Sequence, residues 1–166
     1  GAFNPVPGTF NPNGQAPGMY TFQYTVAGIP PCSDDQATVT INVQSAPNAG
    51  TASVPLELCN SVNAPVLLSD ELFGEDSGGT WTETSTIPSS GGAFNPFLGS
   101  FNPNGQSPGV YTFEYTVTGT PPCVDASETV TVLVSDGPDA GIPNLTITLC
   151  NNANAPLFLA DQVLGE

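Results

Sequence analysis

The sequence of 166 residues contains no Lys, no Arg and no His. These side chains bind phosphate, form Schiff bases and move protons near neutral pH, so their absence removes most catalytic schemes. The charged residues are 15 Asp and Glu, which give a net charge of -15 with no internal counter-charge. We therefore expect a protein that is not an enzyme.

The missing cations also limit the partners of the chain. Proteins bind nucleic acids mainly through Lys and Arg, and anionic membranes recruit polybasic segments. The sequence also has no apolar run long enough to span a bilayer. We expect no nucleic-acid partner and no direct membrane insertion, which leaves cations, neutral polymers such as glycans, and other copies or repeats of the same protein.

The composition favours β-structure. Hydrophobic residues make up 39% of the chain, which is enough to bury a core, while 18 Gly and 18 Pro leave little room for helices. Alternating apolar residues predict strands at Met19 to Val26 and at Ala37 to Val43, joined as a hairpin. Shorter strands are expected at Val54 to Cys59 and around Trp81, with one helical turn between Leu67 and Phe73.

Two dipeptides, Asn13-Gly14 and Asn104-Gly105, are typical of tight hairpin turns in which both central residues have positive φ. The sequence therefore predicts a hairpin turn at each of these places.

An internal repeat dominates the sequence. With an offset of about 91 residues, roughly 42 of the 75 overlapping positions are identical, and no gap is needed. Cys32 then aligns with Cys123, and Cys59 with Cys150. Short Pro and Gly stretches predict three parts, which are the C-terminal part of one repeat (1–47), a complete repeat (48–138) and the N-terminal part of the next (139–166).

Four segments carry a resemblance to a known family. They are Gly-Gly-Thr-Trp (78–81), Pro-Gly-Val-Tyr-Thr-Phe-Glu-Tyr-Thr-Val (108–117), Pro-Pro-Cys-Val-Asp (121–125) and Thr-Val-Thr-Val-Leu-Val (129–134). Together they resemble the PKD-like, immunoglobulin-like tandem repeats of large secreted surface proteins of Bacteroidetes, a kind associated with adhesion and gliding. The resemblance implies an all-β chain of tandem immunoglobulin-like β-sandwich repeats of about 91 residues.

The four Cys residues lack metal-type Cys-x-x-Cys spacing and have no cation nearby to stabilise a thiolate. They predict structural disulfides, and therefore an extracellular, cell-surface location. Loop entropy does not distinguish a Cys59–Cys123 bond from a Cys32–Cys59 bond. An extended array would separate Cys32 from Cys59 by about 50 Å, so we expect Cys59 to pair with Cys123, and Cys32 and Cys150 to pair with neighbouring segments.

Acidic residues are densest at Asp70, Glu71, Glu75 and Asp76. Calcium prefers oxygen ligands, so these four residues are weak candidates for a calcium site, although no EF-hand loop is present. No other cofactor is expected. A close carboxylate pair also occurs in glycosidases, but an isolated pair is weak support for that activity.

Aromatic residues offer a possible sugar-binding surface. Tyr20, Phe22, Tyr24 and Trp81 are best explained as core residues. The four Phe residues that precede Asn-Pro dipeptides are less clearly buried and are candidates for stacking on sugars; they are Phe3, Phe10, Phe94 and Phe101. The triplet Asn144-Leu145-Thr146 matches an N-glycosylation acceptor but is treated as strand sequence.

The repeats favour a non-enzymatic structural module of an extracellular surface fibre or adhesin stalk, because repetition builds length. The repeats would lie in series or be completed head to tail between copies. A carbohydrate-binding or cell-adhesion module with a site on each repeat is the alternative, and a remnant domain of a secreted enzyme is a third possibility.

Overall fold

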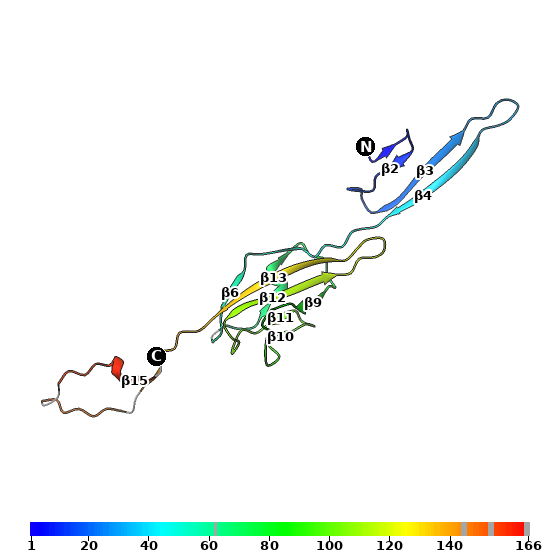
Figure 1. Cartoon of the computed structure of the whole chain (residues 1–166). Coiled ribbons are helices and arrows are strands. Elements are labelled where there is room, and N and C mark those ends of the chain that lie inside the picture. The colour runs from blue at the N-terminus through cyan, green and yellow to red at the C-terminus, as the bar shows by residue number, and fades with distance from the viewer. Residues whose placement is uncertain (62, 144–145, 153–154, 165–166) are drawn as a thin grey trace.

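The computed structural model describes residues 1–61, 63–143, 146–152 and 155–164. These residues form strands and two short 3-10 turns, with no α-helix among them, so the prediction of an all-β protein is confirmed. The chain is drawn out along one direction, with residues 1–47 at one end and residues 139–166 at the other (Figure 1). We call these parts the N-terminal segment and the C-terminal segment, and residues 48–138 the central unit.

The N-terminal segment contains two strand pairs. The first is formed by β1 (Phe3–Asn4) and β2 (Thr9–Phe10). The second is the hairpin of β3 (Gly18–Val26) and β4 (Asp35–Val43), in which Tyr20 pairs with Ile41. Both long strands lie where the alternating pattern predicts them.

The central unit is built on one sheet of four strands in the order β6-β13-β12-β9. β12 (Gly109–Val117) and β13 (Ala126–Ser135) form a hairpin, β9 (Thr80–Glu83) pairs with β12, and β6 (Leu56–Cys59) lies parallel to β13. The shorter elements of the unit are β5 (Thr51–Ala52), β7 (Val66–Leu67), η1 (Leu68–Glu71), β8 (Leu72–Phe73), β10 (Phe94–Asn95) and β11 (Ser100–Phe101).

The core lies within the central unit. Alternate residues of β12 and β13 point inward and meet the small sheets β10-β11-β7 and β5-β8. Phe101 and Phe113 are fully buried, with ring centroids 5.0 Å apart, and Leu68 of η1 is fully buried as well. Leu68 lies in the helical turn that the sequence predicts between Leu67 and Phe73.

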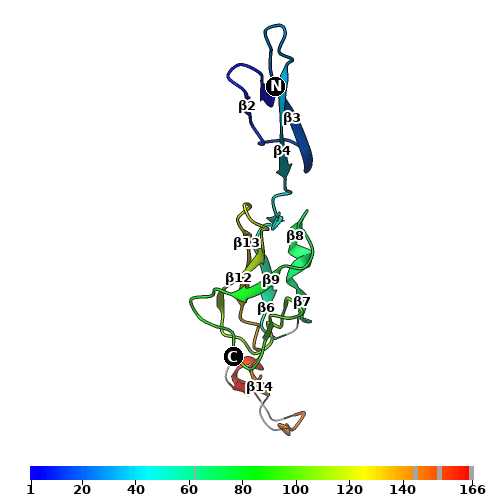
Figure 2. The same cartoon turned by 90° about the vertical axis from the view of Figure 1, so that its right-hand side faces the viewer.

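The C-terminal segment repeats only part of this arrangement. It contains β14 (Ile142–Pro143), η2 (Ala160–Gln162) and β15 (Val163–Leu164), and β14 pairs with β15 as β5 pairs with β8. Figure 2 shows that this segment stays beyond the central unit and does not reach the N-terminal segment. In the parts of the chain that the structure describes, no helix is long and apolar enough to cross a membrane.

The predicted hairpin turns at Asn13-Gly14 and Asn104-Gly105 are wrong. The strands that flank each turn belong to different sheets, because β2 pairs with β1 and β11 pairs with β10 and β7. In each dipeptide only the Gly has a positive φ, at 73°, and the Asn does not. Every described residue with a positive φ is a Gly. Each turn closes through the Gln after the Gly, whose N–H donates to a Pro carbonyl three residues earlier.

Candidate functional site

The two end segments expose the side chains that form the core of the central unit. Tyr115 is 7% exposed, whereas its counterpart Tyr24 is 68% exposed. Leu68 is fully buried, whereas its counterpart Leu159 is 76% exposed. Within residues 1–47, all of which the structure describes, no side chain is buried. Each end segment therefore presents an apolar face of the kind that usually marks an interaction site.

The strand pairs explain this exposure. Pairs within the first half of the repeat (β5-β8) and within its second half (β10-β11 and β12-β13) recur in the end segments. The pairs that join the two halves are β6-β13, β9-β12 and β7-β11. Their counterparts are not formed by the described residues, so β4 and β2 each keep an unpaired edge.

Cys59 and Cys123 do not lie close enough to pair as the sequence suggests. Cys59 ends β6 beside Ser135, whereas Cys123 lies in the loop that precedes β13. Since β13 runs from Ala126 to Ser135 and a strand rises by about 3.3 Å per residue, roughly 30 Å separate the two thiols. A disulfide needs Cα atoms within about 7 Å. The predicted Cys59–Cys123 bond is therefore wrong, and Cys32, Cys59 and Cys123 are free thiols.

Cys59 lies at the end of the central unit that faces the C-terminal segment. The Ser61 hydroxyl, 3.3 Å from the Cys59 Sγ, and the Ser61 backbone lower the pKa of this thiol from its ordinary value, while partial desolvation and Asp136 oppose the shift. A Cβ added to Gly137 would lie 3.3 Å from the Cys59 Sγ. The thiol is thus placed directly against the start of the linker.

Asn60 joins this end of β6 to two other parts of the unit, the turn at Gly105-Gln106 and the start of the linker at Asp136-Gly137. Its side-chain amide donates to Gln106 O at 3.1 Å and to Asp136 Oδ1 at 2.9 Å, and its Oδ1 accepts from Gly137 N at 2.9 Å. Its backbone carbonyl accepts from Gly105 N at 2.8 Å. This network fixes the first half of the repeat to the second half beside Cys59.

Cys123 and Cys32 occupy hairpin loops of the same design. In each loop an Asp closes the turn, because Gly119 N donates to Asp125 Oδ1 and Gly28 N donates to Asp34 Oδ1, both at 2.8 Å. The Cys N–H then donates to the residue three positions earlier, at 2.9 Å in both loops. A Cβ on Gly119 would lie 2.5 Å from Val124 O, so this position requires Gly.

A cavity of about 550 Å³ lies where the N-terminal segment meets the loop of Cys123. One wall comes from the turn after β2 and from the end of β4, and the other comes from Pro122 and Cys123. The residues of the first wall are Pro12, Asn13, Gly14, Gln15, Pro17, Ile41, Asn42, Val43, Gln44, Ser45 and Ala46.

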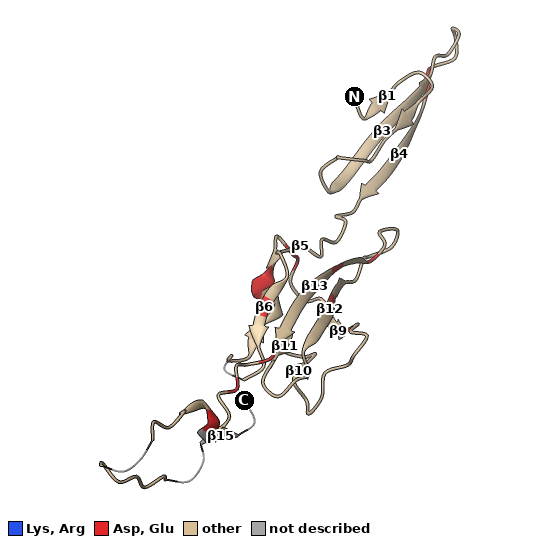
Figure 3. Cartoon of the chain, turned by 60° about the vertical axis from the view of Figure 1, so that its left-hand side comes forward, with Lys and Arg blue, Asp and Glu red and all other residues tan. Residues whose placement is uncertain are grey.

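The acidic residues that the structure describes do not form a metal site. Among the described residues, no group of three or more Asp, Glu or Cys side chains is arranged to hold a metal ion. Asp70 and Glu75 are therefore not part of such a group. Glu71 accepts a hydrogen bond from the Ser53 hydroxyl, and Asp76 accepts one from Asn48 N at 2.9 Å. Figure 3 shows acidic residues scattered along the chain without any cation to offset them.

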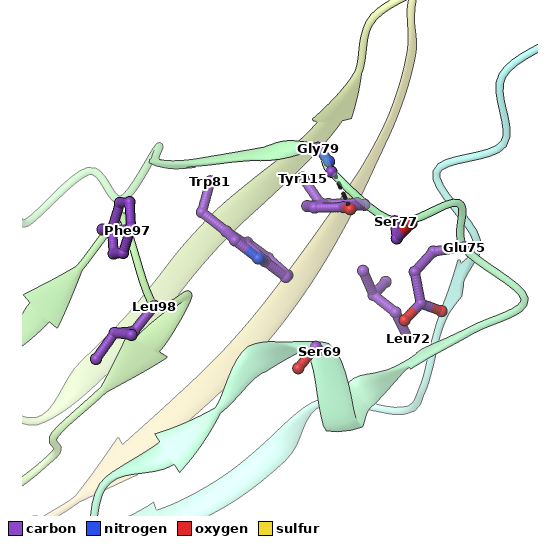
Figure 4. A pocket seen from close by; sticks show the side chains of 10 residues that line it. Ser69, Leu72, Glu75, Ser77, Gly79, Trp81, Phe97, Leu98 and Tyr115 are labelled. Atoms are coloured by element: carbon purple, nitrogen blue, oxygen red, sulfur yellow. Dashed lines mark hydrogen bonds between the residues drawn. The ribbon is translucent and has the colours of Figure 1, made fainter.

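A second cavity, of about 320 Å³, opens beside the single Trp (Figure 4). Trp81 and Tyr115 lie on one side of it, and Leu72 lies on the other. The Tyr115 hydroxyl is already occupied, since it accepts from Gly79 N and donates to Asp76 O, both at 2.8 Å. Of the lining residues only Glu75 carries a carboxylate, so the cavity does not provide the carboxylate pair of a glycosidase.

The sugar-stacking hypothesis for the Phe residues is wrong in the central unit. Phe101 is fully buried, and the rings of Phe94 and Phe101 lie 4.9 and 5.0 Å from the ring of Phe113. Phe3 and Phe10 make the same contacts with Phe22 in the N-terminal segment, at 4.9 and 5.0 Å. The four rings therefore make the same ring contacts in both copies, although Phe3 remains 47% exposed in the N-terminal segment. The glycosylation triplet at 144–146 lies partly outside the described residues.

Sequence reasoning missed the Asn60 network and the cavity beside Cys123. The signal was present, because Asn60, Gly105 and Gln106 are identical to Asn151, Gly14 and Gln15 in the other copy of the repeat. When polar residues near matching cysteines are the same in both copies of a repeat, they are expected to make the same contact in both. The sequence does not say which residues contact one another, because that depends on the register of β6 on β13.

No protein-family model, no curated protein and no solved structure matches the chain. The likeness between the repeats within the chain is thus the comparison that informs its function.

Proposed function

We propose that this chain is a non-enzymatic structural module of an extracellular surface fibre or adhesin stalk, built from immunoglobulin-like β-sandwich repeats of the PKD-like kind. The observation that carries the proposal is the pair of exposed apolar faces on the two end segments. One face belongs to the second half of the repeat and the other to its first half. Since the faces lie at opposite ends of an extended chain (Figure 1), joining them produces a strand of units and not a closed particle.

Three further features support a structural role. The cavities described above hold no arrangement of acid, base and nucleophile, and the sequence offers no cation. Similar units in series give length and stiffness. Joining the halves would also cover the open edges of β2 and β4, which are otherwise a liability for uncontrolled pairing.

The test is association of the intact chain, measured by sedimentation velocity over a wide range of concentration. We expect a series of growing species at high concentration in moderate salt, which screens repulsion between chains of charge -15. Leu159→Asp should abolish the series, because it places a charge in the apolar face of the C-terminal segment. Ile87→Asp is the matched control, since Ile87 is an exposed apolar residue of the central unit outside both faces. A chain that remains monomeric throughout would contradict the proposal.

A further inference from the structure

The cavity beside Cys123 is lined by residues whose counterparts in the central unit surround the Cys59-Asn60 corner. In the central unit, the Cys59-Asn60 corner contacts Gly105, Gln106, Ser135, Asp136 and Gly137. The counterparts of these residues in the N-terminal segment are Gly14, Gln15, Gln44, Ser45 and Ala46, and all of them line the cavity. The cavity is therefore the place that a second Cys-Asn corner would occupy.

The chain carries such a corner in its C-terminal segment. Cys150-Asn151 is the counterpart of Cys59-Asn60, and Leu149 before it is the counterpart of the buried Leu58. Residues 146–150 form no strand here, and Ile147 and Leu149 are exposed. Added to the free edge of β4 in the register that β6 takes on β13, this segment would place Cys150 beside Gln44, which lines the cavity together with Cys123.

Building on the proposed function, we infer that the cavity receives Cys150-Asn151 of a second copy of this chain and that Cys150 forms a disulfide with Cys123 across the junction. The same junction brings the second copy's Cys59, which lies at the end of its central unit, to the Cys32 loop of the first copy. Neighbouring copies are thus linked by bonds that run between successive units, Cys150 to Cys123 and Cys59 to Cys32, and not by bonds within a unit.

The chemistry requires an oxidant, which we take to be a small-molecule disulfide such as oxidised glutathione. One protein thiolate attacks a glutathione sulfur and releases the first glutathione thiolate. The second protein thiolate then displaces the other glutathione, so that two thiols lose two protons and two electrons while one glutathione disulfide becomes two thiols. The lowered pKa of Cys59 favours the attacking thiolate at that position.

The loop of Cys32 in the N-terminal segment and the loop of Cys123 in the central unit have the same hydrogen bonds. Asp34 and Asp125 each close the hairpin loop by the same hydrogen bond, so the Cys32 and Cys123 thiols occupy equivalent places in the two loops.

The test uses the full chain, oxidised with glutathione and separated on non-reducing gels. A ladder of covalent oligomers is expected, and digestion after Glu and Asp should yield peptides linking Cys123 with Cys150 and Cys32 with Cys59. Mixing chains labelled with ¹⁵N and unlabelled chains shows that the bonds are intermolecular. Linkage of Cys59 with Cys123, or of Cys32 with Cys150, would overturn the inference.

Two double variants separate the alternatives, because each keeps two thiols. Cys32→Ser with Cys59→Ser retains Cys123 and Cys150 and should still form covalent dimers of neighbouring chains and longer ladders. Cys59→Ser with Cys123→Ser retains Cys32 and Cys150, which lie at opposite ends of the β3-β4 hairpin when the two copies are joined, and should form none. A ladder from the second variant and none from the first would refute the pairing. If chains associate in sedimentation but neither variant crosslinks, the disulfide inference fails while the proposed function stands; if no chain associates, both fail.

Discussion

Leu68 and Leu159 are the same residue at the same place in the repeat, and they provide a controlled pair of substitutions. Leu68 is fully buried in the core of the central unit, and its N–H donates to Gly99 O at 2.8 Å. Leu68→Ala removes three carbon atoms from this site and leaves a cavity, so the free energy of unfolding should fall by about 2 to 5 kcal/mol. In a unit of this size the melting temperature should drop by roughly 10 °C or more.

Leu159→Ala should have a different effect. With 76% of its surface exposed, Leu159 contributes little to the isolated chain, and the free energy of unfolding should change by no more than about 0.5 kcal/mol. When the C-terminal segment of one copy joins the N-terminal segment of the next, the two form what we call a joined unit. In this joined unit, Leu159 would take the place that Leu68 takes in the central unit. Association should then weaken by about 2 to 5 kcal/mol, which corresponds to a dissociation constant roughly 30-fold to several thousand-fold higher.

Both variants can be followed through Trp81, the single Trp, which lies in the central core and reports unfolding by its fluorescence. Urea titrations of dilute chains give the free energies of unfolding, and sedimentation of concentrated chains gives the association. If Leu159→Ala destabilised the dilute chain as much as Leu68→Ala does, the C-terminal segment would be packed against its own chain. If Leu159→Ala left association unchanged, its face would not be part of the junction.

Three other outcomes are expected. Reductant should leave the urea midpoint of the dilute chain unchanged, because Cys59 and Cys123 lie at opposite ends of the sheet; a lower midpoint would reveal a bond within the unit. Calcium should raise stability only as much as sodium chloride of equal ionic strength, since the described carboxylates form no metal site, and a saturable effect at low calcium would contradict this. Burial, and then the charge of Glu83, raise the pKa of Tyr111 above its ordinary value, so the stability present below about pH 10 should be lost as pH rises through the folded-state pKa. Tyr111→Phe should flatten this loss in pH-dependent urea titrations while the exposed-site control Tyr24→Phe does not, and equal slopes would refute the assignment.

The local structure was largely predictable from the sequence. The alternating residues of β3, β4, β12 and β13 have the period of a half-buried strand, and the buried face is the predicted one in the central unit. The short turn at η1 was predicted as well. These elements depend on neighbours in sequence, so local patterns are sufficient to place them.

The cysteine pairing was not predictable in the same way. It depends on the parallel addition of β6 to β13, which carries Cys59 to the end of the sheet opposite the Cys123 loop. Neither loop entropy nor the spacing of the cysteines along the chain indicates that β6 runs parallel to β13. The turns at Asn13-Gly14 and Asn104-Gly105 were misjudged for a related reason, since a dipeptide predicts a turn but does not say which sheets the flanking strands join.

The most direct test of the central claim is negative-stain electron microscopy of the intact, concentrated chain under oxidising conditions. The account predicts unbranched strands of beads in single file, in which joined units alternate with central units, and their loss in the Leu159→Asp variant. Isolated particles, or closed rings and pairs in place of open strands, would contradict it.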